Sequence, residues 1–127
     1  MTTSARAIAA TSQPDNRQSR IVTDEDVGKA LDWLRDSARE LGQAKERLTL
    51  ATGMIRHVEA LEFKMSDAKS AEARKADART SDRYIEAVTE EAKAAGAYEM
   101  MRALREAAAA KIEAWRTESS NYRAMKI

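Results

Sequence analysis

A repeat of large aliphatic residues constrains the fold of this chain more than any other feature. Leu34, Leu41, Leu48 and Ile55 follow one another at intervals of seven residues. Further apolar residues continue this pattern at steps of three or four, namely Val27, Leu31, Ala38, Ala51 and Val58. Because an α-helix has about 3.6 residues per turn, this spacing places the apolar side chains on one face, as in a coiled coil. The sequence therefore predicts a long amphipathic helix over residues 24–65.

The start of this helix is marked by capping residues. Thr23 precedes three acidic residues, 24–26, and such acids stabilise the positive end of the helix dipole. Val22 and Val27 have the spacing of a hydrophobic staple, in which the residue before the cap packs on the first full turn. We therefore expect Thr23 to be the N-cap.

A second apolar repeat occupies the C-terminal part of the chain. Its members are Ile85, Val88, Ala92, Ala95, Tyr98, Met101, Leu104, Ala108, Ile112 and Trp115. They recur at steps of three or four and predict a helix over residues 82–124. The segment between the two repeats, 66–81, is polar, and within it residues 71–79 read as a short helix without large apolar side chains.

Two long amphipathic helices joined by a polar segment predict an all-α fold. The simplest arrangement is a long antiparallel, coiled-coil-like hairpin over residues 23–127, with residues 66–81 at its tip. Residues 1–22 contain the only proline and few large apolar side chains, so we expect a flexible tail there. A two-helix hairpin buries little apolar area, which favours dimerisation into a four-helix bundle.

The composition excludes several kinds of chemistry. There is no cysteine, so neither a disulfide nor a thiol nucleophile is available, and His57 is the single histidine. The glycines stand alone within helical patterns and form no phosphate-binding loop. We therefore expect a protein that is not an enzyme and has no cofactor and no metal. No apolar run suits a signal peptide or a membrane span, which predicts a cytoplasmic protein without membrane contact.

The polar segment and its flank carry a basic cluster that is a candidate for nucleic-acid contact. Its members are Lys69, Arg74, Lys75, Arg79 and Arg83. Lys75, Arg79 and Arg83 are four residues apart, which would align them on one helix face along a phosphate backbone. Acidic residues are interleaved with them and no aromatic residue is available for base stacking, so a solvated, salt-bridged face is the competing interpretation.

Large side chains beside the repeats are candidates for contact with a partner or with a second copy. They are Trp33, Leu50, Met54, Leu61, Met100 and Trp115. Packing in the core or in a dimer is the simplest role for the two tryptophans, and a partner-binding groove is the alternative.

Two passages, residues 65–75 and 107–117, resemble small uncharacterised helical proteins of tailed bacteriophages and prophages. Such proteins are often encoded near replication and recombination genes. The resemblance implies a phage accessory protein that acts in the host cytoplasm, and it assigns no activity to particular residues.

These features lead to a hypothesis of function by macromolecular binding. The leading interpretation is a non-enzymatic accessory protein that supports phage DNA recombination or replication through a partner. Three alternatives remain open: direct nucleic-acid binding through the basic cluster, inhibition of a host defence complex in the manner of an anti-CRISPR protein, and a structural role in the virion.

Overall fold

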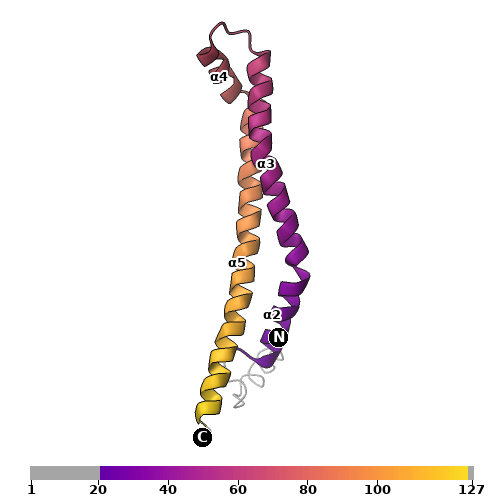
Figure 1. The fold of residues 1–127 in the computed structure, drawn as a ribbon, viewed down its shortest axis with the longest axis vertical. Coiled ribbons are helices and arrows are strands. Elements are labelled where there is room, and N and C mark those ends of the chain that lie inside the picture. The colour runs from indigo at the N-terminus through magenta and orange to yellow at the C-terminus, as the bar shows by residue number, and fades with distance from the viewer. Residues whose placement is uncertain (1–20, 126–127) are drawn as a thin grey trace, which may run out of the picture. The chain divides into compact units, whose positions relative to one another are not determined.

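The computed structural model describes residues 21–125, and these are almost entirely helical (Figure 1). The helices are α2 (Asp24–Asp36), α3 (Ala38–Met65), α4 (Ala71–Arg79) and α5 (Asp82–Met125). The described residues contain no strand, so the predicted all-α class is confirmed. The predicted flexible tail, 1–22, lies outside the described residues except for Ile21 and Val22.

The chain divides into two compact units. The terminal unit comprises Met1–Arg35 and Ala107–Ile127, and the central unit comprises Asp36–Glu106. Helix α5 contributes its first part to the central unit and its last part to the terminal unit. The span predicted as one hairpin, 23–127, is thus distributed over both units.

Helix α2 in the terminal unit begins with the predicted helix cap. The Asp26 N–H donates to the Thr23 hydroxyl (3.1 Å), and the Thr23 N–H donates to the Asp26 carboxylate (3.1 Å). This reciprocal pair satisfies backbone donors that have no partner within the helix. The backbone N–H of Thr23, and then its side chain, also hold the pKa of Asp26 below its ordinary value. Val22 and Val27 are both buried, as a hydrophobic staple requires.

The predicted continuous helix over 24–65 is interrupted at Ser37, so this part of the prediction is wrong. Helix α2 ends at Asp36 and α3 begins at Ala38. Ser37 is buried, and its hydroxyl accepts a hydrogen bond of 2.7 Å from Nη1 of Arg105. The two residues are 68 positions apart in the sequence, so no local pattern could indicate this contact.

In α3 the buried face follows the predicted repeat. Its partly buried apolar residues are Leu41, Ala44, Leu48, Ala51, Ile55 and Val58. Ala44 rather than Lys45 fills the position where a charged residue interrupts the heptads. Leu31 and Ala38 were predicted to share the same face, but both are exposed. Val27 and Leu34 in α2 are buried and partly buried, as the repeat predicts, so the repeat fails at Leu31 and Ala38 and holds again from Leu41 onward.

In α5 the buried face is shifted by one residue from the prediction in its first part. The buried or partly buried positions spaced by three and four are Tyr84, Ala87, Glu91, Ala94, Tyr98, Met101, Arg105, Ala108, Ile112 and Trp115. Ile85, Val88 and Ala92 are exposed, and so is Leu104, whereas the predicted Ala95 is partly buried next to Ala94. Glu91 and Arg105 are charged residues in the buried face of α5. A hydropathy pattern assigns apolar residues to such a face, which explains why the sequence predicted that their apolar neighbours would be buried.

Three contacts within the central unit connect α3, or Ser37 directly before it, with the first part of α5. Glu62 lies 3.9 Å from Arg83, the Lys45 ammonium lies 5.1 Å from the ring centre of Tyr98, and Ser37 bonds to Arg105. As residue numbers fall along α3, they rise along α5. The two segments therefore run in opposite directions where these contacts occur.

Candidate interaction surfaces

The basic cluster predicted from the sequence lies around α4, which packs against α3. Arg74 is fixed within the chain, because its Nε donates to the carbonyl of Ala68 (2.8 Å). Its guanidinium also lies 6.0 Å from the ring centre of Phe63, a cation–π distance. This arginine therefore helps to hold the connection between α3 and α4.

The predicted alignment of Lys75, Arg79 and Arg83 on one helix face is wrong. Helix α4 ends at Arg79 and α5 begins at Asp82, so Arg83 belongs to a different helix. Arg79 forms an ion pair of 3.2 Å with Glu59, and Arg83 forms a longer one of 3.9 Å with Glu62. Lys69 and Lys75 are exposed.

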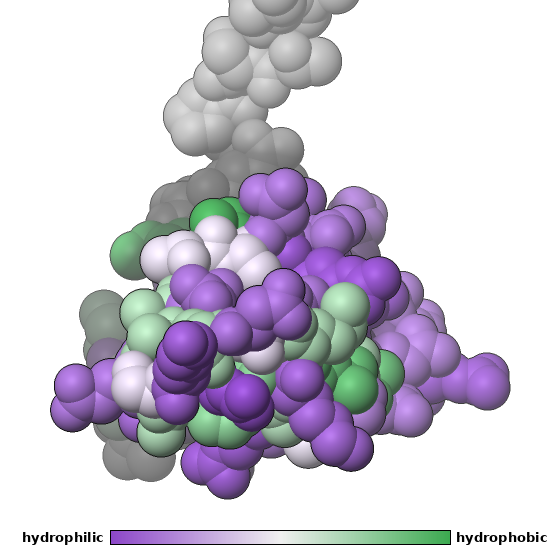
Figure 2. Space-filling view, turned by 90° about the horizontal axis from the view of Figure 1, so that it is seen from above, coloured by the Kyte–Doolittle hydropathy of each residue, from purple (hydrophilic) through white to green (hydrophobic). Residues whose placement is uncertain are grey.

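The local sequence explains why α4 takes its place beside α3. The Ser70 hydroxyl caps the helix by accepting from the Ala73 N–H (3.1 Å). The Ser66 hydroxyl donates to Asp77 (2.6 Å), which ties the end of α3 to α4. Ala78 is completely buried, so its methyl group marks the closest packing of α4. Seen from above, the end of the molecule that carries α4 has hydrophilic side chains interspersed with hydrophobic areas (Figure 2).

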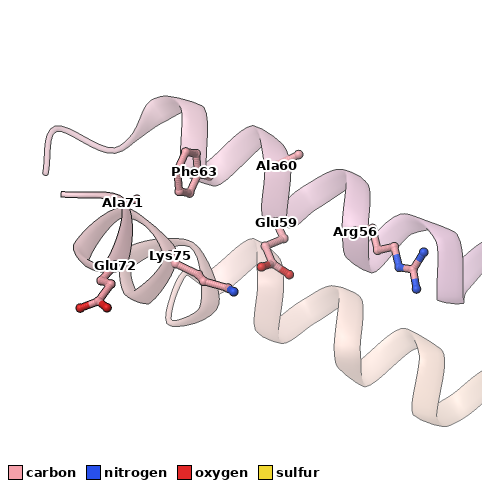
Figure 3. A pocket seen from close by; sticks show the side chains of 7 residues that line it. All are labelled: Arg56, Glu59, Ala60, Phe63, Ala71, Glu72 and Lys75. Carbon is pink, nitrogen blue, oxygen red and sulfur yellow. The ribbon is translucent and has the colours of Figure 1, made fainter. Parts of the chain in front are cut away.

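An open groove lies between α3 and α4 (Figure 3). The residues that line it are Arg56, Glu59, Ala60, Phe63, Ala71, Glu72 and Lys75. Phe63 supplies the large apolar surface, and the two alanines leave room beside its ring. Two basic and two acidic side chains surround this apolar centre, so the groove has no strong preference for one sign of charge.

A second groove in the central unit lies between α3 and α5. Its lining residues are Arg47, Leu50, Ala51, Met54, Arg83, Glu86, Ala87 and Glu90. Met54 and Leu61 are seven residues apart, as are Glu90, Ala97 and Leu104, so each set repeats on one face of its helix. Leu61, Ala97 and Leu104 therefore lie on the same face as this groove, beyond its lining residues.

This face carries exposed apolar side chains that we call the apolar stripe. It consists of Leu50, Met54 and Leu61 on α3 and of Ala97, Met100 and Leu104 on α5. Leu50 is 66% exposed, Met100 64% and Leu104 50%. Four of the six residues that the sequence identified for partner contact are therefore on one face. Leu104 was missed because the pattern assigned it to the buried side of α5.

The two remaining candidates, Trp33 and Trp115, belong to the terminal unit. Both are partly buried, and the indole N–H of Trp115 donates to the Asp24 carboxylate (2.7 Å). This hydrogen bond links α2 to the last part of α5 within that unit. The tryptophans are thus separate from the apolar stripe of the central unit.

The other side of the α3–α5 pair has a different character. The ring of Tyr98 has two cationic neighbours, with Lys45 at 5.1 Å and Arg102 at 5.7 Å from its centre. Ile85 and Val88 are exposed, at positions of the heptad that differ from those of the stripe. They did not figure among the candidates, since the repeat placed them in the buried face.

Among residues 21–125, no cluster of three or more histidine, aspartate or glutamate side chains is arranged to hold a metal ion. Within the same residues, no helix combines the length and apolar character needed to cross a membrane. No protein-family model, curated protein or solved structure matches the chain.

Proposed function

We propose that this chain is a non-enzymatic helical interaction protein that acts by binding another macromolecule. The apolar stripe is the observation that carries this proposal. Single exposed apolar residues are common on protein surfaces, whereas a contiguous row of them is typical of an interaction site. Leucine and methionine make up most of this row, and methionine adapts its shape readily to a partner surface.

The fold that supports this surface is, in our proposal, an antiparallel coiled-coil-like hairpin of α3 and the first part of α5. The reversed order of the contacts from Glu62–Arg83 to Ser37–Arg105 supports it. The regular spacing of the partly buried residues in both helices agrees with heptad packing. The stripe then lies along one side of the paired helices, where a further helical layer could cover it.

We propose a protein rather than a nucleic acid as the partner. A phosphate-binding surface depends on basic side chains that are free to replace counterions. Arg74, Arg79 and Arg83 instead contact a carbonyl or carboxylates of the same chain. An apolar row gains more from burial against protein side chains than from contact with a charged backbone.

The setting we propose follows from the sequence resemblance of residues 65–75 and 107–117. It is that of a phage or prophage accessory protein in the host cytoplasm, with a partner that takes part in DNA recombination or replication. Small helical proteins are suited to such a role because surface complementarity alone can recruit or hold a partner.

Affinity purification from cells that express the gene tests this function. We expect a specific protein to co-purify with the unaltered chain and to be lost from Met54→Glu, which places a charge in the apolar stripe. Ile85→Glu is the matched control, because Ile85 is a similarly exposed apolar residue at a different heptad position. The Ile85→Glu variant should still co-purify with the protein partner.

Binding to labelled DNA at low and moderate salt completes the test. The chain should bind weakly or not at all, and a triple charge reversal at Lys75, Arg79 and Arg83 should have no effect on partner capture. Salt-sensitive DNA binding that disappears in the triple variant, without any protein partner, would contradict the proposal.

A further inference from the structure

We infer that the apolar stripe is the contact surface for a second copy of this chain, which joins two α3–α5 pairs into a four-helix arrangement. This inference rests on the proposed function in that both use the stripe as a binding surface. It names a second copy of the chain as the occupant of the stripe and gives the orientation in which that copy lies.

The first argument is the shortage of buried apolar surface in the central unit. Within residues 36–106, which are all described, the buried hydrophobic side chains are Ala78 and Ala94. The large seam residues Leu48 and Ile55 are only partly buried. A pair of helices with such a thin core gains stability when a second pair covers the residues beside its seam.

The second argument is the oblique course of the stripe. Leu61 lies next to Glu62, which contacts Arg83 near the start of α5, so the α3 part of the stripe is near α4. Leu104 lies next to Arg105, which contacts Ser37, so the α5 part is near the start of α3. The stripe thus passes from one helix to the other. A two-fold axis along it places every stripe residue against the stripe of the second copy.

The third argument is the distribution of charge on the two sides of the stripe. Glu86 and Glu90 lie on α5 beside the half of the stripe that α3 provides, together with Arg83, which forms an ion pair with Glu62. Arg47 lines the same groove from α3, on the opposite side of the stripe from Glu90. A two-fold axis along the stripe exchanges these two sides. Glu90 then faces Arg47 of the second copy, which favours association.

An axis across the stripe gives the opposite result. It would bring Glu90 against Glu90 and Arg47 against Arg47 of the second copy, and like charges at an interface oppose binding. Both axes align the two stripes, but the charges favour the orientation with the two-fold axis along the stripe.

Sedimentation equilibrium of the full chain tests self-association. The mass should approach twice the 14.1 kDa of one chain. Met54→Glu should raise the dimer dissociation constant about 100-fold or more, because it buries an unpaired charge. Ile85→Glu should leave the mass unchanged, and circular dichroism should show the same helix content in all three proteins.

A charge exchange tests the orientation. Arg47→Glu and Glu90→Arg should each weaken the dimer about tenfold, and the double variant should recover most of the loss. Recovery is the result that a general loss of structure cannot produce. A double variant weaker than both single variants would overturn the orientation along the stripe.

The outcomes separate this inference from the proposed function. A chain that remains at 14.1 kDa at high concentration, or a dimer that tolerates Met54→Glu, overturns the inference. If the monomeric chain still captures a protein through the stripe, the proposed function stands without the dimer. A stripe-dependent dimer that captures no other protein supports the inference and contradicts the proposed function.

Discussion

The terminal and central units are stabilised in different ways. The terminal unit buries Val22, Val27 and Ala30, and its helix α2 starts at a reciprocal cap between Thr23 and Asp26. The central unit has longer helices, but its buried apolar side chains are two alanines. Short helices can thus be fixed by a cap and a few branched side chains. Long helices with an alanine-rich seam depend on many small contacts.

This difference predicts where each unit is sensitive to substitution. In the central unit, the tight positions are small residues, so added volume is more harmful than lost volume. In the terminal unit, the specific interactions are hydrogen bonds at a helix start, so their removal is the sensitive change.

The largest effect is expected from Ala94→Leu in the central unit. Ala94 is 3% exposed, and a larger side chain there should cost about 1–3 kcal/mol of unfolding free energy. Urea unfolding followed by circular dichroism measures this cost. Ala92→Leu is the control, since Ala92 is exposed on the same helix and the change should stay within about 0.5 kcal/mol. Equal costs at the two positions would contradict the one-residue shift of the α5 seam.

The next largest effect is expected from Thr23→Ala in the terminal unit. Loss of the hydroxyl removes the acceptor for the Asp26 N–H and should cost about 1 kcal/mol. Thermal unfolding of the variant should therefore begin at a lower temperature. Thr23→Ser keeps an acceptor oxygen and should restore most of the stability, and a serine variant as weak as the alanine variant would argue against the cap.

A gain of stability is expected from Gly53→Ala in α3. A Cβ atom built at Gly53 meets no atom within 4 Å, so the substitution adds helix propensity without a clash. The expected gain is about 0.5–1 kcal/mol. Gly28→Ala in α2 has equally open surroundings and should give a similar gain. A loss at Gly53 alone would indicate that this surface is covered in solution.

The smallest effect concerns acidic pH and the Asp26 carboxylate. Its pKa is lowered in the folded chain, so its stabilising contribution is complete above the ordinary value of 3.8. That contribution is lost as the pH falls through the lower, folded-state pKa. The melting temperatures of the unaltered chain and of Asp26→Asn should therefore converge below pH 3.8. A constant difference between pH 6 and pH 2 would contradict the lowered pKa.

The sequence predicted the features that depend on neighbouring residues. The Thr23 cap, the short helix over 71–79 and the buried face of α3 from Leu41 to Val58 follow from local preference and heptad spacing. Most of the stripe residues were also found, because large apolar side chains beside a seam are visible in the sequence.

The features that were missed depend on distant contacts. The interruption at Ser37 accompanies its bond to Arg105, and the position of Arg83 depends on where α4 ends. The seam of α5 was ambiguous because alanine occurs at 92, 94 and 95, so hydropathy does not distinguish between them. Glu91 in the seam made the neighbouring aliphatic residues the more obvious choice.

The position of both tryptophans in the terminal unit has a practical consequence. Trp33 and Trp115 both belong to this unit, which also contains Tyr122, whereas the central unit contains tyrosines but no tryptophan. Excitation at wavelengths that tryptophan absorbs and tyrosine does not therefore gives emission from the terminal unit alone. The circular dichroism of the backbone amides reports on both units. Unfolding of the terminal unit can thus be followed by tryptophan fluorescence and compared, in the same sample, with the unfolding of both units.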